Sequence, residues 1–446
     1  MSLRAFVEDL RHHGQLTVIK VEVDPNLELA GIIFALQGKP VLFPHVRREG
    51  FRVLSGICGT RDLFARALGV DRADLVRTMA RALDGPTAPD ETPAAAAACH
   101  EVVEPDVDLD RLPILTHTAL DGGPYVTTGI VVVRDPELGQ NVSFHRLMQI
   151  GPRRFTARVV EGRGLHTALG KSIGDLPIAI CVGNSLPVLL AAAMSPAKGV
   201  NELHIANALQ PTPVTRCLDS DLWVPADSEI VLEGRLTHQM TDEGRFIDLT
   251  GTLDYVRRQP VIEIDRVTHR RAPFFHALLP GGAEHKMLMG MPREPTIYAE
   301  VSRDCDCRNV YITPGGTSWL HAVVQIGKQR PDDGQRAIQA AFRGHTSLKH
   351  VVVVDTDVDL FDSADVEWAI ATRFQANRDL VVLHDQPSSS LDPSASHALG
   401  AKTRTSKLGL DATIPWTAPD GSLLSMEERS SFQRVAYQPV DLRRYL

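Results

Sequence analysis

The sequence lacks a long apolar run, an excess of basic residues and a secretion signal. Its longest apolar runs, such as residues 178–182 and 351–354, are far shorter than the roughly 20 residues of a membrane-spanning helix. The net charge of −8 argues against a nucleic-acid partner, because phosphate backbones bind basic surfaces. The N-terminal segment MSLRAFVEDL is amphipathic and carries acids, unlike a signal peptide. We therefore expect a cytoplasmic protein with neither a membrane nor a nucleic-acid partner.

Cysteines at a metal-binding spacing and the common nucleotide-binding and hydrolase motifs are also missing. Of six cysteines, only Cys305 and Cys307 are close together, and their spacing is too tight for the usual zinc knuckle. No glycine-rich stretch has the spacing of a dinucleotide-binding or phosphate-binding loop, and G-x-S-x-G is absent. Reduced thiols are expected, and Rossmann, P-loop and hydrolase sites are not favoured.

The chain has the length and composition of a globular protein with two or three domains: 446 residues, 43% hydrophobic and 23% charged. Residues 1–98 predict a small α/β domain that ends in a Pro- and Ala-rich linker from residue 85. Its expected elements are helices at 3–10, 27–37, 61–68 and 73–83 and a strand at 41–43.

The middle of the chain, residues 99–294, is dominated by strand patterns and predicts a split β-barrel with helical insertions. Strands are expected at 129–133, 142–149, 155–160, 178–182, 230–236, 246–255 and 261–267, and helices at 187–194 and 202–209. Residues 295–446 alternate between strands at 310–312, 350–354 and 380–383 and helices at 335–343 and 364–374. They predict a C-terminal α/β domain for oligomerisation, with a tail from residue 387 that packs on the body or on a partner subunit. The whole chain is thus expected to be α/β (α+β).

Residues 141–166 are predicted to form two antiparallel strands. They carry three polar side chains that are unusual in a core hairpin: Asn141, Arg146 and His166. A buried guanidinium needs a partner. Glu243 and Asp248, at a turn that leads into an expected strand, supply two carboxylates. Beside an arginine one carboxylate stays charged while the other tends to hold its proton, which makes a proton-delivery device. The alternative is an exposed hairpin tip with solvated charges.

Asn141, His166 and Glu202 are suitable ligands for a divalent cation such as Mg²⁺ or Mn²⁺. They have no metal-motif spacing, so a histidine that is simply hydrogen-bonded is the alternative.

Five blocks in order resemble the UbiD family of reversible decarboxylases, which use prenylated FMN. The first, at 141–146, has the form N-x-S-x-x-R, and His166 follows at a similar distance. The second runs from 191 to Glu202, and the third, 228–234, precedes Glu243 and Asp248. The last two are at 359–373 and 408–413.

The resemblance implies a Mn²⁺ (or Mg²⁺) ion, held by Asn141, His166 and Glu202, that bridges to the cofactor phosphate. It implies a K⁺ ion near Ala191, Ala192, Met194, Glu202 and Arg373. It also implies a set of cofactor-binding residues: Asn141, Ser143, Phe144, Arg146, His166, Met194, Glu202 and Lys349.

For catalysis the resemblance implies an acid–arginine–acid triad of Arg146, Glu243 and Asp248. Substrate carbon bonds covalently to the prenylated flavin, CO₂ leaves, and Glu243 returns a proton to the carbon. Two departures from the family pattern are His145, where an aromatic or small residue is expected, and an aspartate as the second acid.

His285 and Arg293 resemble a region that faces the substrate in furan-dicarboxylate decarboxylases of this family. Because arginine binds carboxylates bidentately, a heteroaromatic acid of the furan or pyrrole type is expected. Alternatively, Arg293 pairs with Glu294 or Glu300 on a helix, and the substrate is another unsaturated or polycyclic aromatic acid.

The resemblance further implies a flavin prenyltransferase as supplier of the cofactor and a homo-oligomer, dimeric or hexameric. Two other classes stay open: a flavin-dependent oxidoreductase and a non-catalytic flavin-binding protein. Hydride transfer does not need the acid–arginine–acid triad, so the triad favours decarboxylation.

Overall fold

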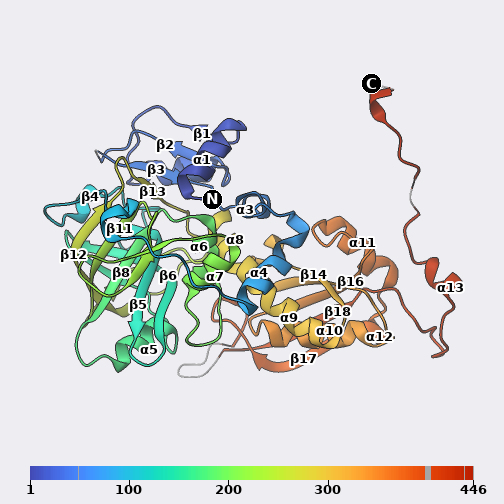
Figure 1. Ribbon diagram of the computed structural model, residues 1–446. Helices are drawn as coiled ribbons and strands as arrows, with labels where there is room; N and C mark the ends of the chain where they lie inside the picture. The colour runs from blue at the N-terminus through green and yellow to red at the C-terminus, as the bar shows by residue number, and fades with distance from the viewer. Residues whose placement is uncertain (49, 397–402, 436, 445–446) are drawn as a thin grey trace. The chain divides into compact units, whose positions relative to one another are not determined.

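The computed structural model describes residues 1–48, 50–396, 403–435 and 437–444 (Figure 1). The chain divides into two compact units, Met1–Arg293 and Glu294–Leu446. Each unit has its own hydrophobic core. Among the residues described, no helix is both long and apolar enough to cross a membrane. All six cysteines of the sequence are buried and free of disulfides.

The first unit begins with four helices around a small sheet. The helices are α1 (Leu3–His12), α2 (Glu28–Ala35), α3 (Arg61–Leu68) and α4 (Leu75–Asp84). Amphipathic spacing explains α1, whose Leu3, Phe6, Val7 and Leu10 form one buried stripe. The sheet has the order β1 (Thr17–Val18), β2 (Val41–Phe43), β3 (Arg52–Ser55) and β13 (Phe274–His276). The last strand comes from far along the chain and runs parallel to β3.

Six strands of the first unit close into a barrel, which confirms the expected mixed α/β fold with a central β-barrel. Their order is β11 (Ile230–Glu243), β8 (Leu176–Val182), β5 (Tyr125–Asp135), β6 (Gly139–Gly151), β7 (Arg154–Ala157) and β12 (Arg257–His269). Antiparallel pairing of β11 with β12 closes the ring. The short β4 (Val102–Val103) adds to β12, and β9 (Val214–Arg216) pairs with β10 (Trp223–Pro225).

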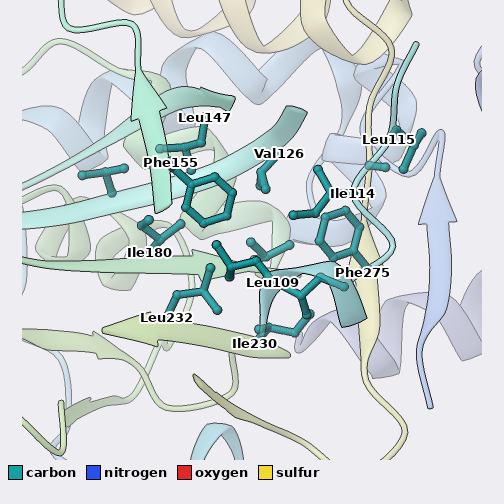
Figure 2. Close-up of a cluster of buried hydrophobic side chains, with 14 of the residues drawn as sticks. Leu109, Ile114, Leu115, Val126, Leu147, Phe155, Ile180, Ile230, Leu232 and Phe275 are labelled. Carbon is teal, nitrogen blue, oxygen red and sulfur yellow. The ribbon is translucent and has the colours of Figure 1, made fainter. Parts of the chain in front are cut away.

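Alternating apolar side chains fill the barrel and hold its strands together. Figure 2 shows Leu147 of β6, Phe155 of β7 and Ile180 of β8 converging with Leu232 of β11. All four are fully buried. Each such side chain contributes roughly 1.5–3 kcal/mol relative to an exposed position, so this core fixes the register of β6.

Four short helices accompany the barrel: α5 (Gly164–Lys171), α6 (Leu186–Ala193), α7 (Glu202–Leu209) and α8 (Ala283–Gly290). The expected linker from residue 85 is held along the chain by backbone bonds, from Thr87 N–H to His204 O (3.1 Å) and from Thr92 N–H to Val214 O (2.7 Å).

Two sequence predictions in this region are wrong. Residues 246–255 form a turn segment with a single bridge between Ile247 and Leu253 rather than a strand. Gly251 there has a φ of 76°, and the backbone N–H of Asp248 donates to Thr252 O, so the chain folds back on itself. His166 lies on helix α5 rather than on a strand. Leu165 and Ala168 of α5 are buried at helical spacing, a period that is easily missed in so short a helix.

The second unit is a mixed five-stranded sheet with helices. The strand order is β14 (Cys307–Ile312), β15 (His321–Ile326), β16 (His350–Asp355), β18 (Arg404–Asp411) and β17 (Leu380–Pro387). The helices are α9 (Glu294–Asp304), α10 (Asp333–Gly344), α11 (Ser363–Arg373), α12 (Ala376–Asp379) and α13 (Met426–Ser430). Parallel pairs join β15, β16 and β18, and antiparallel pairs close both edges.

Candidate active site

Strand β6 carries predicted site residues on both of its faces. Successive side chains of a strand point to opposite sides, so Asn141, Ser143 and His145 share one face, and Phe144 and Arg146 share the other. The Asn141 face is also that of Leu147, whose side chain lies in the barrel core. The two faces therefore have different neighbours and different chemistry.

Arg146 is buried and bound by two carboxylates. Its Nε and Nη2 donate to the two oxygens of Glu243 at 2.6 and 3.0 Å, and Nη2 also donates to Asp254 Oδ2 at 2.8 Å. The guanidinium lies 4.9 Å from the ring centroid of Phe246. Burial opposes its charge, but Glu243 and Asp254 outweigh that effect and raise the pKa of Arg146. The arginine is thus held permanently charged between two acids.

The second acid on Arg146 is Asp254 and not Asp248, which corrects the predicted pairing. Asp248 lies within the turn, where its carboxylate accepts from the backbone N–H of Leu249 at 2.6 Å. Asp254, at the far end of the same turn, donates its backbone N–H to Phe246 O and is thereby brought back to Arg146. Sequence reasoning missed Asp254 because the segment was taken for a strand. The only available signal was a further acid before the next strand.

The other face of β6 carries a continuous hydrogen-bonded chain. Asn141 Nδ2 donates to Glu202 Oε1 at 3.1 Å, and Ser143 Oγ lies between Asn141 Oδ1 (3.5 Å) and His145 Nε2 (3.1 Å). His145 Nδ1 lies 3.0 Å from Arg158 O, and burial lowers its pKa. His145, fixed by Arg158 O, therefore orients Ser143.

Glu202 is a buried carboxylate without a cationic partner among its recorded contacts. It begins α7, capped by Asn201, and accepts the backbone N–H of Val142 at 2.7 Å. Burial raises its pKa to about 7, against the hydrogen bonds from Val142, its own backbone and Asn141. A bound cation would favour its ionised form, so this oxygen-rich pair of Asn141 and Glu202 fits a Mg²⁺ or Mn²⁺ ion.

The side chain of His166 is exposed, but Gly164, two residues earlier, is in tight contact with Asn141. The contact is made by Gly164, the first residue of α5, where an added Cβ would lie 2.5 Å from Asn141 Oδ1. The structure thus brings Asn141 and Glu202 into contact and places His166 on the helix that packs against Asn141. It records no bond from His166 to either.

His285 and Arg293 both belong to the first unit and are largely shielded from water. Burial lowers the pKa of His285 to about 4, Asp248 opposes this, and Arg146 and Lys286 add to it. Arg293 ends a 3₁₀ turn, Met291–Arg293, and its burial together with the charge of Arg163 lowers its pKa to about 10. His285 therefore lies within electrostatic range of Asp248 and Arg146, while Arg293 lies near a second arginine.

The remaining predicted residues divide between the units. In the first, Ala191 and Ala192 are buried on α6, and Met194 is buried at its end. In the second, Arg373 donates to Asp357 Oδ2 at 2.6 Å, and Lys349 Nζ lies 3.0 Å from Asp392. A guanidinium repels K⁺, so only the backbone oxygen of Arg373 could bind a potassium ion.

Three profiles of one enzyme family together match most of the chain. They describe the N-terminal domain (residues 7–83), the Rift-related domain (91–283) and the C-terminal domain (286–412) of 3-octaprenyl-4-hydroxybenzoate carboxy-lyase, UbiD.

Curated and structural relatives extend over nearly the whole chain. A protein of Methanosarcina mazei named anhydromevalonate phosphate decarboxylase is 41% identical over 421 residues, covering 93% of this chain and 96% of that protein. The UbiD-class enzyme HmfF from Pelotomaculum thermopropionicum, solved with FMN, has a TM-score of 0.92 and 36% identity, with both chains covered fully. An evolved dimeric form of HmfF was solved with prenylated FMN and has a TM-score of 0.88 and 35% identity, again with full coverage of both chains. A 3,4-dihydroxybenzoic acid decarboxylase from Enterobacter cloacae has a TM-score of 0.89 and 28% identity, covering 100% of this chain and 98% of that one.

Proposed function

The chain belongs to the UbiD family of carboxy-lyases, and we propose that it releases CO₂ from an unsaturated carboxylic acid with prenylated FMN as its cofactor. The observation that carries this proposal is the largely buried Arg146, which donates bidentately to Glu243 and through one further bond to Asp254. A flavin oxidoreductase does not need such an arrangement, because hydride transfer requires no acid beside an arginine. Decarboxylation needs both a cation for the carboxylate and a proton for the carbon left behind.

Arg146 and Glu243 divide these two tasks. A substrate carboxylate that takes an N–H of Arg146 weakens the bidentate pair with Glu243. A buried carboxylate that loses its cation takes up a proton from solvent more readily, so Glu243 can donate that proton to the carbon once CO₂ has left, and it takes another proton from solvent before the next turnover. Phe246, against the guanidinium, keeps water away from the exchange.

The Asn141 face of β6 is the proposed side for the cofactor phosphate. Asn141 and Glu202, with His166 from α5, would hold the Mn²⁺ ion, and Ala191, Ala192 and Met194 would contribute to the K⁺ site. The prenylated flavin, when bound, supplies the electron sink that the protein itself lacks. Its supplier would be a flavin prenyltransferase, and the working form would be a homo-oligomer.

For the substrate we favour anhydromevalonate phosphate, an unsaturated acid that also carries a phosphate. The name of the Methanosarcina mazei relative supports it. So does the largely buried Arg293, whose lowered pKa results from burial and from the charge of Arg163, because a phosphate dianion near it would favour its charged form. The second candidate is an aromatic or heteroaromatic acid of the furan or pyrrole type. Likeness to the 3,4-dihydroxybenzoic acid decarboxylase supports it.

The reaction class is tested with Glu243→Gln in protein co-expressed with a flavin prenyltransferase. We expect CO₂ release to fall by roughly 10²–10⁴-fold, the contribution of a positioned general acid, while the flavin absorption spectrum is retained. Glu233→Gln is the matched control, because Glu233 is equally buried and accepts two backbone N–H groups (2.8 Å each). Full turnover in Glu243→Gln would refute the mechanism. Flavin binding without CO₂ release from any acid would favour a non-catalytic carrier.

The substrate is tested by comparing anhydromevalonate phosphate, its unphosphorylated form and a panel of furan, pyrrole and hydroxybenzoic acids. We expect Arg293→Gln to raise KM for the phosphorylated acid at least tenfold and to change KM for the unphosphorylated acid little. Release of CO₂ from an aromatic acid alone would establish the second candidate.

A further inference from the structure

A second polar cluster lies in the first unit, away from Arg146, and consists of Ser55, Cys58, His276 and Glu284. All four side chains are buried. Glu284 is its centre, with Ser55 Oγ 3.1 Å from Oε2. The backbone N–H and the thiol of Cys58 and Nε2 of His276 are each 3.1 Å from Oε1. We call this set the Glu284 cluster.

The Glu284 cluster is built as a set of hydrogen-bond donors around one carboxylate. Burial alone would raise the pKa of Glu284, but His276 and the donors at Gly56 and Cys58 outweigh it, and the pKa is lowered. Cys58, His276 and Glu284 also have the residue types and closeness of a metal site. Their polar atoms, however, meet at the oxygen Oε1 itself, which already receives three donors. The geometry is that of a buried, ionised carboxylate whose charge is stabilised by hydrogen bonds from the protein.

The cluster joins three segments that are far apart in sequence. Ser55 ends β3, His276 ends β13, and Glu284 is the second residue of α8. The N-cap residue of α8, Gly282, has no side chain with which to cap the helix. The carboxylate of Glu284 therefore fixes the first turn of α8 against the small sheet.

The next residue of that turn is His285, whose side chain points about 100° away around the helix axis. Its Nδ1 accepts the backbone N–H of Gly281 at 2.9 Å, so in the neutral ring the proton is on Nε2. The charged groups within electrostatic range of it are Asp248, Arg146 and Lys286. An added Cβ at Gly281 would lie 3.1 Å from Asp248 O, so this loop and the turn that carries the acids are in contact.

We propose that the Glu284 cluster is a positioning device for the reaction: it fixes the first turn of α8 so that His285, whose Nδ1 accepts from Gly281, presents its Nε2–H to the turn segment that carries Asp248. This inference rests on the proposed function for its catalytic consequence. Glu284, His276 and Cys58 do not reach the reacting atoms, and they act through the placement of His285. Two of the donors lie at the ends of β3 and β13, which are paired in one sheet, and Cys58 lies in the loop after β3. The sheet therefore fixes the positions of the donors.

The test combines Glu284→Gln and His285→Gln, alone and together, in enzyme loaded with prenylated FMN. We expect Glu284→Gln to lower kcat about tenfold and to add an acid limb to its pH profile near pH 6.5, the ordinary pKa of histidine. A merely unfolded fraction would lower kcat at every pH without a new limb. In the His285→Gln background, Glu284→Gln should have no further effect on kcat.

A gentler pair of variants keeps the test valid if Glu284→Gln does not fold. Cys58→Ala removes one donor and should shift the pH profile in the same direction, and Cys58→Ser should restore it. Additive effects of the Glu284 and His285 variants would overturn the proposal. So would a stoichiometric metal ion in the purified protein that Cys58→Ala abolishes.

A measurement that does not depend on catalysis tests the positioning device independently of the proposed reaction. In ¹⁵N-histidine NMR spectra, the His285 signal, assigned by its loss in His285→Gln, should stay neutral with the proton on Nε2 from pH 8 to pH 5. It should titrate in Glu284→Gln. Failure to release CO₂ from any acid would count against the reaction alone, whereas a titrating His285 in the wild type would count against the positioning device.

Discussion

Arg146 shows how a single buried charge organises its surroundings. A guanidinium that leaves water loses hydration and must recover it from ionised partners. Glu243, the last residue of β11, and Asp254, near the end of the turn segment that follows, supply them at 2.6 and 2.8 Å. The residues of the candidate site are therefore coupled, because both acids bind the same guanidinium.

We predict that Asp254→Asn lowers kcat by roughly 10–100-fold, within the range for loss of part of an acid–base device. With Asp254 neutral, Arg146 binds Glu243 alone and keeps it ionised, so proton return slows. Asp248→Asn should cost less, since Asp248 does not touch Arg146. Steady-state kinetics of the two variants, with flavin content measured in parallel, checks the order. The reverse order would mean that the turn segment rearranges during turnover and brings Asp248 to Arg146.

One contact of this site can be predicted from the sequence and another cannot. The need of Arg146 for a carboxylate follows from charge alone, and Glu243 meets that need in the structure. The choice between Asp248 and Asp254 does not follow, because both are aspartates near the same strand end. Only the fold of the turn at residues 246–255, set by Gly251 and its backbone bonds, decides between them.

Among the elements, α5 is in direct contact with a residue of the proposed cation site. Its first residue, Gly164, lies against the side chain of Asn141, closer than a residue with a Cβ allows. The helix is short and has no side-chain N-cap bond. Contact with Asn141, together with the buried Leu165 and Ala168, therefore determines where His166 lies.

We predict that Gly164→Ala weakens Mn²⁺-dependent flavin binding at least tenfold, because the added Cβ displaces either Asn141 or the start of α5. Gly170→Ala in the same helix is the control, since its Cβ meets nothing within 4 Å. That change should leave binding intact and raise stability by about 0.5–1 kcal/mol, the helix preference of alanine over glycine. Flavin fluorescence titration and thermal melting measure the two effects. Equal affinities in both variants would remove α5 from the cation site.

Sequence patterns recovered the barrel better than its surroundings, and the reason is the range of the interactions. The strands of the barrel contain short runs rich in β-branched and aromatic residues, bounded by Gly, Pro and Asp, and this is a local signal. The pairing of β13 with β3 joins residues more than 200 positions apart and leaves no local trace. Strands β15 and β18 were not expected, although both are central in their sheet. Strand β18, RTSKLGLD, begins with four polar residues, and β15, HAVVQI, is only a short apolar run, so neither has a strong strand pattern.

At the scale of the whole molecule, the C-terminal tail exposes an unusual amount of apolar surface. Val435, Tyr437, Val440 and Leu442 are all more than half exposed. Up to Arg434 the tail is tied to its own unit, where Phe432 O accepts from Arg373 and Arg434 pairs with Asp365 at 2.6 Å. Beyond that point apolar side chains face water, a condition typical of a surface that another subunit covers.

We predict that deletion of residues 435–446 lowers the oligomeric state and leaves the fold of each unit intact. The apolar side chains removed would be those that a second copy buries. Light scattering coupled to size-exclusion chromatography measures the mass, and circular dichroism verifies the fold. An unchanged mass after the deletion would show that the subunits associate through another surface.

The two-faced strand β6 has a consequence for how this protein can change. The residues proposed for the cation site occupy odd-numbered positions, and Arg146, proposed for the acid–base chemistry, occupies an even-numbered one. Point substitutions can therefore alter one activity while sparing the other, and new substrates can be acquired without rebuilding the cofactor side. A single inserted or deleted residue, in contrast, would exchange the two faces and abolish both at once. We expect libraries of this strand to tolerate replacements far better than changes of length.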